Sequence, residues 1–529
     1  MKNYHCRQQP ECAILRTTVE RTADRDFCIQ GKNDMTLGIP TTGAAGKAAD
    51  LAPWQGSAPR DEFFWLSEIN KATFLTNTAA GLLDPGKAAQ WARAQMRVIE
   101  KGNTPGNPRP KMYVRYEPLL IAEAGIDVTL IHAGRSSQDM HATFQRAILR
   151  DAVLRVGRAL QSVRRALYKL ADENRETIAP CYTNGVAAQP NKLAHVWLGH
   201  LEGFRRDFEG LQEFWNRLNE CPMGTTVLNG TPWPLNREAM AERLGFDRIV
   251  ENAYDAAQIS ATDIAVEASL KLVSPLLHVT QFIEDVMTQY AQPRPWILVM
   301  STYASTAMPQ KRNPGAIIDV RRDANQVLGE LSGVLYRAHD LMPGMYDAKD
   351  EHINGTVVNE AAQVLERFAA MLGLLKVNPQ RALEELNLDW TASQNIADIM
   401  MQRFGVPFRE GHHYASRLVT YARSRELTPR TLPYADAKAQ YEAMVQEEKL
   451  EIPAQFPFTE QEFASLLDPR AIVESRRTRG GPQKAELERL MGACLKRVDE
   501  DEQWLTQTAG KLDQAIRTLD RDFESFCAN

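Results

Sequence analysis

Apolar residues recur at intervals of three and four along most of the chain from residue 60 onward. The clearest run lies between residues 142 and 172, where the apolar positions are Phe144, Ile148, Ala152, Val156, Ala159, Val163, Ala166 and Leu170. This spacing places them on one face of a helix of about eight turns. Similar patterns cover residues 191–219, 255–290, 315–340, 352–376 and 485–526. Because these segments exceed the usual helix length, they predict a bundle of long helices.

Helix-breaking residues separate these segments. Asp84 and Pro85 are typical of an N-cap and of a first helical position, so a helix is predicted to begin there. Pro and Gly cluster at 221–234, 292–296 and 308–315, and no alternating strand pattern or strand–helix–strand unit is evident. We therefore predict an all-α fold with a long central helical bundle and smaller N-terminal and C-terminal helical domains.

The same pattern divides the chain into four segments. Residues 1–58 contain a stretch rich in Gly, Ala, Thr and Pro without apolar periodicity, which is typical of a flexible N-terminal extension. We expect an N-terminal helical domain over residues 59–139 and the central helical bundle over 140–390. A C-terminal helical domain is expected over 391–529.

Composition excludes several classes of protein. The chain has 529 residues, 44% of them hydrophobic, with 62 Lys and Arg against 67 Asp and Glu, which is an ordinary globular composition. Its formal charge of −5 provides no basic surface for nucleic acid or for an anionic membrane. No apolar run reaches the ~18–20 residues of a membrane span, and the N-terminus lacks a secretory signal. We expect a cytoplasmic protein with neither nucleic-acid nor membrane partners.

Cysteine and histidine spacing gives no support for a metal site. The seven cysteines form no CxxC pair, and His195 and His200 are five residues apart, whereas two ligands on one helical face require three or four. Neither GxGxxG nor a phosphate-binding loop is present. We therefore expect no metal and no cofactor.

The most informative segment runs from Ala304 to Pro314, with the sequence ASTAMPQKRNP. Its composition alone is compatible with a polar loop between helices. Its residue order resembles the loop Gly-Ser-Ser-x-Met-Pro-x-Lys-x-Asn of the fumarase/aspartase superfamily. Ala304 replaces the glycine of that pattern, and Thr306 replaces its second serine.

Three further segments narrow the resemblance to the argininosuccinate lyases. The segment LIHAGRSSQD at 130–139 is similar to His-Thr-x-Arg-Ser-Arg-Asn-Asp of that family, and PCYTNGVAAQP at 180–190 is similar to Pro-Gly-Tyr-Thr-His-Leu-Gln-x-Ala-Gln-Pro. GVPFREGH at 405–412 resembles Gly-x-Pro-Phe-Arg-x-x-His. The resemblance covers roughly residues 60–485, and the segments occur in the order of the family.

The resemblance implies roles for three residues of the loop. Ser305 would be the general base that removes a proton from the carbon β to the leaving group of a succinyl-type substrate. Because a serine hydroxyl is a poor base, its oxyanion must be stabilised by fixed donors, a role that Lys311 and the loop amides would fill. Lys311 could also stabilise the aci-carboxylate intermediate, and Asn313 would bind a substrate carboxylate.

The other implied substrate-binding residues each have a structural alternative. Thr183 and Ser136 could bind a carboxylate or cap a helix. Arg135 could contact substrate, although a structural ion pair with Asp139 is the preferred interpretation. Tyr346 corresponds to a family tyrosine on the amine side, or it is a packed aromatic.

Several positions depart from the family pattern. The catalytic histidine is replaced by Asn184, which cannot deliver a proton at neutral pH. The Arg-Asn pair that grips the substrate carboxylates is replaced by Ser137 and Gln138. His132 is a second candidate for the acid, and its alternative is a helix-terminal packing or capping residue.

These departures motivate a hypothesis about the substrate. A guanidine-type leaving group gains from a placed acid, whereas a secondary alkylammonium leaves with its own proton. We therefore predict a carbon–nitrogen lyase that eliminates a basic amine from an N-substituted aspartate to give fumarate, or that catalyses the reverse addition. The alternatives are an orthodox argininosuccinate lyase of arginine biosynthesis, a lyase that releases ammonia or a larger aminocarboxylic acid, and a non-catalytic, crystallin-like relative.

The resemblance also implies an assembly. In the superfamily, the central helices of four subunits form one larger bundle, and each active site collects its segments from different chains. A homotetramer with composite active sites is therefore expected, and the long apolar stripes agree with it.

Overall fold

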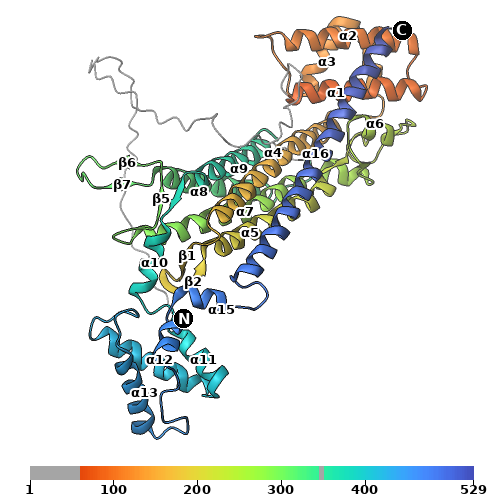
Figure 1. Cartoon of the computed structure of the whole chain (residues 1–529). Coiled ribbons are helices and arrows are strands. Elements are labelled where there is room, and N and C mark those ends of the chain that lie inside the picture. The colour runs from red at the N-terminus through yellow and green to blue at the C-terminus, as the bar shows by residue number, and fades with distance from the viewer. Residues whose placement is uncertain (1–59, 345–350, 529) are drawn as a thin grey trace, which may run out of the picture. The chain divides into compact units, whose positions relative to one another are not determined.

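Long helices packed side by side dominate the computed structural model, which describes residues 60–344 and 351–528 (Figure 1). The central helices are α4 (Ser137–Glu173), α5 (Leu193–Leu218), α7 (Ser260–Tyr290), α8 (Gly315–Arg337) and α9 (Glu351–Leu372). Each one coincides with a long apolar pattern of the sequence, so the predicted all-α bundle is confirmed. The predicted N-terminal extension, residues 1–58, lies outside the described residues.

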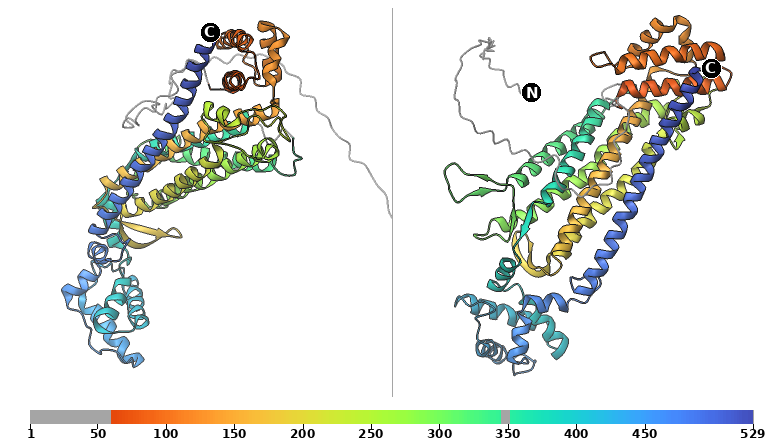
Figure 2. Two further views of the ribbon diagram at one scale, coloured as in Figure 1. Left: turned by 90° about the vertical axis from the view of Figure 1, so that its right-hand side faces the viewer. Right: turned by 45° about the horizontal axis from the view of Figure 1, so that its top comes forward.

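The largest apolar core lies between these central helices. Helix α4 packs against α5 and α9, and α7 packs against α8 and α9 (Figure 2). Val156, Val163 and Leu167 of α4 are fully buried in this core, as the stripe of period three and four requires. Burial of this stripe makes α4 the central member of the bundle.

A second apolar core joins the N-terminal helices. These elements are α1 (Glu62–Ala79), α2 (Pro85–Asn103), α3 (Tyr113–Ala124) and the 3₁₀ helix η1 (Ile126–His132). The carboxylate of Asp84 accepts a hydrogen bond from the amide of Lys87 at 2.9 Å, and Pro85 is the first helical residue. The predicted N-cap at Asp84 is therefore confirmed, and it fixes where α2 begins.

A third apolar core belongs to the C-terminal helices. It is built by α11 (Gln394–Phe404), α12 (Phe408–Arg423), α13 (Tyr434–Glu448) and α14 (Glu460–Leu466), while Val473 of α15 (Pro469–Ser475) lies in a separate small cluster with Ile178 and Leu386. Tyr414 and Tyr441 lie fully buried at its centre with their rings edge to face. Helix α10 (Pro379–Leu388) contacts β1 (Ile178–Thr183) and α15, and so joins these helices to the bundle.

The last helix, α16 (Lys484–Ala528), packs outside the C-terminal core. It lies along α4 and α5 and reaches α1 and α2, where Ile516, Leu519 and Phe523 enter the second core. We expected residues 391–529 to form one C-terminal helical domain, whereas α16 contacts the bundle. A helix of 45 residues is longer than the C-terminal helices, and its apolar stripe needs the long bundle to cover it.

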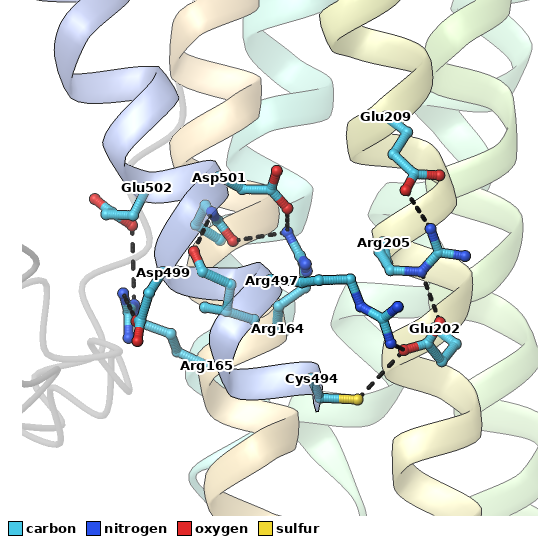
Figure 3. Close-up of polar contacts among 12 residues, drawn as sticks. Arg164, Arg165, Glu202, Arg205, Glu209, Cys494, Arg497, Asp499, Asp501 and Glu502 are labelled. Carbon is cyan, nitrogen blue, oxygen red and sulfur yellow. Dashed lines mark hydrogen bonds and ion pairs between the residues drawn. The ribbon is translucent and has the colours of Figure 1, made fainter. Parts of the chain in front are cut away.

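Charged contacts fix how α16 lies on the bundle (Figure 3). Arg164 of α4 is fully buried and donates to Asp501 of α16 at 2.6 Å and to Gln161 at 3.0 Å. On α5, Glu202 accepts hydrogen bonds from Arg497 and Cys494 of α16. These directional contacts select one register between helices whose apolar stripes alone would allow several.

Short strands accompany the helices. They are β1, β2 (Val186–Lys192), β3 (Glu220–Cys221), β4 (Arg248–Ile249), β5 (Ile297–Val299), β6 (Tyr303–Ala304), β7 (Arg312–Asn313) and β8 (Leu375–Val377). β1 pairs with β2, β5 with β8 and β6 with β7, all antiparallel, while β3 and β4 pair in parallel. These strands were not predicted from the sequence, because most of them are too short to show alternating apolar and polar residues.

Two remaining helical elements lie between β3 and α7. They are α6 (Arg237–Arg243) and the π-helix η2 (Asp255–Ile259), which leads directly into α7. Within the described residues, no helix combines the length and the apolarity that crossing a membrane requires.

The buried ion pair of Arg164 and the exposed one next to it should respond differently to truncation. We expect Arg164→Ala to lower the free energy of unfolding by about 3–5 kcal/mol, because it leaves Asp501 without its buried partner. Arg165 pairs with Asp499 at 3.2 Å with about half of each side chain exposed, so Arg165→Ala should cost about 0–1 kcal/mol. Urea unfolding followed by circular dichroism measures both, and equal losses would contradict this role of Arg164.

Candidate active site

The Ser305 loop is held by a short hairpin. β6 and β7 pair with Tyr303 opposite Asn313, so the chain between them turns back on itself. The amides of Ala307 and Met308 donate hydrogen bonds to Ser305 Oγ at 3.3 and 3.1 Å. Donors in these positions would stabilise an alkoxide on Ser305 and so increase its strength as a base.

Lys311 and Asn313 lie on the returning side of the same loop. The amide of Ser305 donates to the carbonyl of Lys311 at 3.4 Å, and Asn313 Nδ2 donates to the carbonyl of Tyr303 at 3.4 Å. The three predicted residues of this loop are therefore brought together. The loop is largely exposed, and the hairpin projects from the side of the bundle in both Figure 1 and the right-hand view of Figure 2.

Thr183 and Asn184 lie at the tip of the hairpin formed by β1 and β2. Asn184 and Gly185 have φ values of +53° and +75°, as both central residues of a type I′ turn require. Asparagine tolerates this left-handed conformation better than most residues. The side chains of Thr183 and Asn184 are exposed at the tip, away from the core.

Ser136, Ser137 and Gln138 form the start of α4. Ser136 is the N-cap, and its hydroxyl accepts a hydrogen bond from the amide of Gln138 at 3.2 Å. The carboxylate of Asp139 accepts from the amide of Ser136 at 2.7 Å and completes a capping box. This half-buried helix N-terminus is suited to an anion, because its amides and its dipole both favour negative charge.

Asp139 anchors a turn from a distant part of the chain. Its second carboxylate oxygen accepts hydrogen bonds from the amides of Gly224, Thr225 and Thr226 at 3.0, 3.0 and 3.1 Å. Burial raises the pKa of Asp139 to about 6, although these amides, that of Ser136 and the charge of Arg135 oppose the shift. Asp139 therefore fixes the 224–226 turn against the start of α4.

Arg135 is buried and donates its hydrogen bonds to neutral hydroxyls. Its two terminal nitrogens donate to Thr73 Oγ1 at 3.0 Å and to Tyr113 Oη at 2.9 Å. Its guanidinium also lies over the Tyr113 ring, 4.9 Å from the ring centroid. These contacts give Arg135 a structural role in joining α1 and α3, while Asp139 is bound by backbone amides.

His132 ends η1, four residues before the N-cap of α4. Its ring packs against Tyr113, and its Nδ1 lies 3.8 Å from Glu117 Oε1. Burial lowers the pKa of His132, the charge of Arg135 lowers it further, and Glu117 opposes both. The imidazole is therefore mainly neutral at neutral pH.

The π-helix η2 lies at the same end of the bundle as the 224–226 turn. Gln258, in η2, donates from Nε2 to the carbonyl of Val227 at 3.3 Å, directly after the turn that Asp139 anchors. A Cβ at Gly344 would lie 3.7 Å from Gln258 Oε1, so the segment before Tyr346 passes close by. Tyr346 itself lies outside the described residues.

The predicted site residues that the structure describes thus form three groups along the chain. They are the 132–138 group, the Thr183–Asn184 hairpin tip and the Ser305 loop. Helix α4 has 37 residues and spans about 55 Å, and the first two groups lie at its opposite ends. Among the described residues, no cluster of three or more His, Cys, Asp or Glu side chains is arranged to hold a metal ion.

Comparisons with known protein families agree with the residue pattern. A family model described as "Lyase" matches residues 121–329, and a second model, "Argininosuccinate lyase C-terminal", matches residues 390–474. The argininosuccinate lyase of Pelotomaculum thermopropionicum is 30% identical over 439 residues, which cover 81% of this chain and 89% of the relative. The enzyme of Methanothrix thermoacetophila is 28% identical over 87% of this chain and 93% of the relative.

Solved structures share the fold at lower identity. EDDS lyase in complex with formate matches with a TM-score of 0.79 and 22% identity, over 88% of this chain and 92% of that chain. The class II fumarase of Schistosoma mansoni matches with a TM-score of 0.63 and 14% identity, over 79% of this chain and 92% of that chain.

Replacing Asp139 should loosen the start of α4. We expect Asp139→Asn to lower the free energy of unfolding by about 1–3 kcal/mol, because the amide has one oxygen where the carboxylate has two and its NH₂ faces backbone donors. Asp127→Asn, at an exposed position of η1, is the matched control and should change stability by less than about 0.5 kcal/mol. Urea titration of the two variants and the wild type checks this. An Asp139 variant as stable as the control would show that the turn is held by other contacts.

Proposed function

Because this chain belongs to the argininosuccinate lyase family of the fumarase/aspartase superfamily, it is a fumarate-forming carbon–nitrogen lyase, and we propose that its substrate is an N-substituted aspartate with a basic amine. The observation that carries this proposal is Asn184. It occupies the place of the family's proton-donating histidine, at the exposed tip of the hairpin.

Two kinds of leaving group differ in whether the nitrogen already carries the proton with which it departs. An amide side chain donates a hydrogen bond but does not deliver a proton at neutral pH. A guanidinium nitrogen is a poor leaving group, and a placed acid typically contributes about 10²–10⁴-fold. An alkylammonium already carries its proton, so its elimination tolerates asparagine at position 184.

The base and its stabilising donors remain in the sequence. In the proposed reaction, Ser305 takes a proton from the succinyl carbon while the amides of Ala307 and Met308 stabilise its oxyanion. Lys311 stabilises the aci-carboxylate intermediate, and Asn313 binds a substrate carboxylate. Asn184 and Thr183 at the hairpin tip, with Ser136, Ser137 and Gln138 at the start of α4, complete the binding of the dicarboxylate.

The orthodox reaction of arginine biosynthesis is the second candidate. It is favoured by the relatives above, which are argininosuccinate lyases. The replacement of the family's Arg-Asn pair by Ser137 and Gln138 weighs against it, because the pair's guanidinium is lost.

A homotetramer with composite sites is part of the proposal. The three residue groups lie apart in one subunit, so a complete site requires segments from other copies. Large apolar side chains lie exposed where those copies would pack. They are Leu270 and Leu277, two turns apart on α7, Tyr336 on α8, and Leu298, Met300, Tyr303 and Met308 around the Ser305 loop. Exposed large apolar side chains in this number support an interface there.

Removal of the proposed base should abolish turnover. We expect Ser305→Ala to lower kcat for fumarate formation by at least about 10³-fold, because no other group replaces the alkoxide. Thr306→Ala removes the neighbouring hydroxyl and is expected to retain activity within a few-fold. Fumarate absorbance measures both rates, and equal effects of the two substitutions would contradict the role of Ser305.

The substrate proposal predicts an order of rates. We expect N-alkyl aspartates to release fumarate at least about 10²-fold faster than argininosuccinate. Elimination from argininosuccinate gains from a proton donor on the enzyme, and the asparagine at position 184 does not supply one. An absorbance screen over N-substituted aspartates, run in both directions, measures this order.

Asn184→His should raise the argininosuccinate rate, since histidine also tolerates the left-handed backbone of the turn. Rapid turnover of argininosuccinate by the wild type would instead establish the orthodox function.

A further inference from the structure

The imidazole of His132 has one buried and one exposed edge. Its Nδ1 is shielded from solvent and has no hydrogen-bond partner, yet 39% of the side chain is exposed. The exposed part is therefore the opposite edge, which includes Nε2. The carboxylate oxygen Oε1 of Glu117 faces the buried edge, 3.8 Å from Nδ1.

Tyr113 holds Glu117 in this position. Its hydroxyl donates to Glu117 Oε1 at 3.2 Å, four residues further along the same helix α3. The same hydroxyl accepts from Arg135 Nη2 at 2.9 Å, and the Tyr113 ring is 3% exposed and stacks against His132 with centroids 5.4 Å apart. An ordered chain of polar contacts thus runs from Arg135 through Tyr113 and Glu117 to His132.

This chain determines which ring nitrogen carries the proton. A carboxylate facing Nδ1 favours a proton there, so the neutral imidazole presents the lone pair of Nε2 outward. The charged groups that act on His132 from the packed elements are Arg135, which disfavours its protonation, and Glu117, which favours it. The ring is therefore poised to accept a proton at Nε2 and to return it.

The ring also lies near the start of α4, to which the proposed function assigns binding of the dicarboxylate. His132 precedes the N-cap of α4 by four residues, at the bundle end that holds Gln258 and the 224–226 turn. On the basis of the proposed function, we infer that Glu117 and Tyr113 are positioning residues that present Nε2 of His132 to the substrate nitrogen. His132 then accepts the proton of the amine and returns it, which Asn184 cannot do.

Every proton is accounted for in the addition and in the elimination. In the addition, the ammonium of the incoming amine gives a proton to His132 Nε2, its nitrogen bonds to fumarate, and the resulting carbanion takes a proton from the Ser305 hydroxyl. The cycle ends when His132 loses that proton and the Ser305 alkoxide regains one through solvent. In the elimination, Ser305 takes the carbon proton, the C–N bond breaks, and imidazolium protonates the released amine. No oxidant or further reactant is needed.

The test compares variants of the enzyme in the addition of the best alkylamine to fumarate, the direction in which neutral His132 must take the ammonium proton before the C–N bond forms. His132→Ala should lower kcat of the addition about 10²-fold and regain activity with added imidazole. Glu117→Gln should lower kcat about tenfold with little change in KM and should move the histidine-dependent limb of the pH profile to lower pH, because imidazolium loses its anionic partner. Tyr113→Phe should move the limb in the same direction by less.

His413 supplies the matched control, because it also faces a carboxylate, Glu448, at 2.8 Å on exposed helices of the C-terminal domain. His413→Ala should leave kcat and the pH profile unchanged. Loss of activity in His132→Ala without imidazole rescue, or a pH limb that Glu117→Gln does not move, would overturn the inference.

A second measurement does not depend on turnover. Deuterium exchange at the imidazole Cε1, followed by mass spectrometry, reports the titration midpoint of each histidine. We expect the midpoint of His132 to fall in Glu117→Gln while that of His413 stays fixed. An unchanged His132 midpoint overturns the positioning role even if the wild type is active, whereas a shifted midpoint without fumarate formation from any aspartate would leave the positioning intact and refute the proposed substrate class.

Discussion

The length of α4 is the constraint on which the rest of the structure depends. One unbroken helix of 37 residues, about 55 Å long and with its apolar stripe covered by α5, α9 and α16, separates the Ser136 turn at its start from the Asn184 hairpin that follows its end. The packed bundle around it prevents bending. The Ser136 turn and the Asn184 hairpin are therefore held at a fixed separation, and rigidity of this kind gives each of them a defined position before any substrate binds.

The sequence predicted the features that depend on local periodicity or on short motifs. The long helices follow from apolar residues at steps of three and four, and the start of α2 follows from Asp84 and Pro85. The Ser305 loop was recognisable because its residues are contiguous. The Asn184-Gly185 turn also had a local signal, since Asn-Gly is a strong indicator of a type I′ hairpin, but Pro180 and Pro190 obscured the flanking strands.

Features that depend on distant parts of the chain were not predictable. Nothing near Asp139 indicates that its carboxylate accepts from the amides of residues 224–226, more than 80 positions away. The contact of Tyr113 with Arg135 likewise joins α3 to the loop before α4. Motif comparison treats such positions one at a time, whereas the structure shows that Tyr113, Glu117, Arg135 and His132 form one connected set. A substitution at one of these four positions therefore affects the contacts of the others.

The position of α16 bears on how the chain acquires its fold during synthesis. Ile516, Leu519 and Phe523 contribute to the apolar core of α1, α2 and α3, yet they are synthesised more than 390 residues after the end of α3. Until α16 has been synthesised, the helices α1, α2 and α3 keep part of their apolar surface open to water. A chain truncated before α16 would keep that surface exposed to chaperones and proteases.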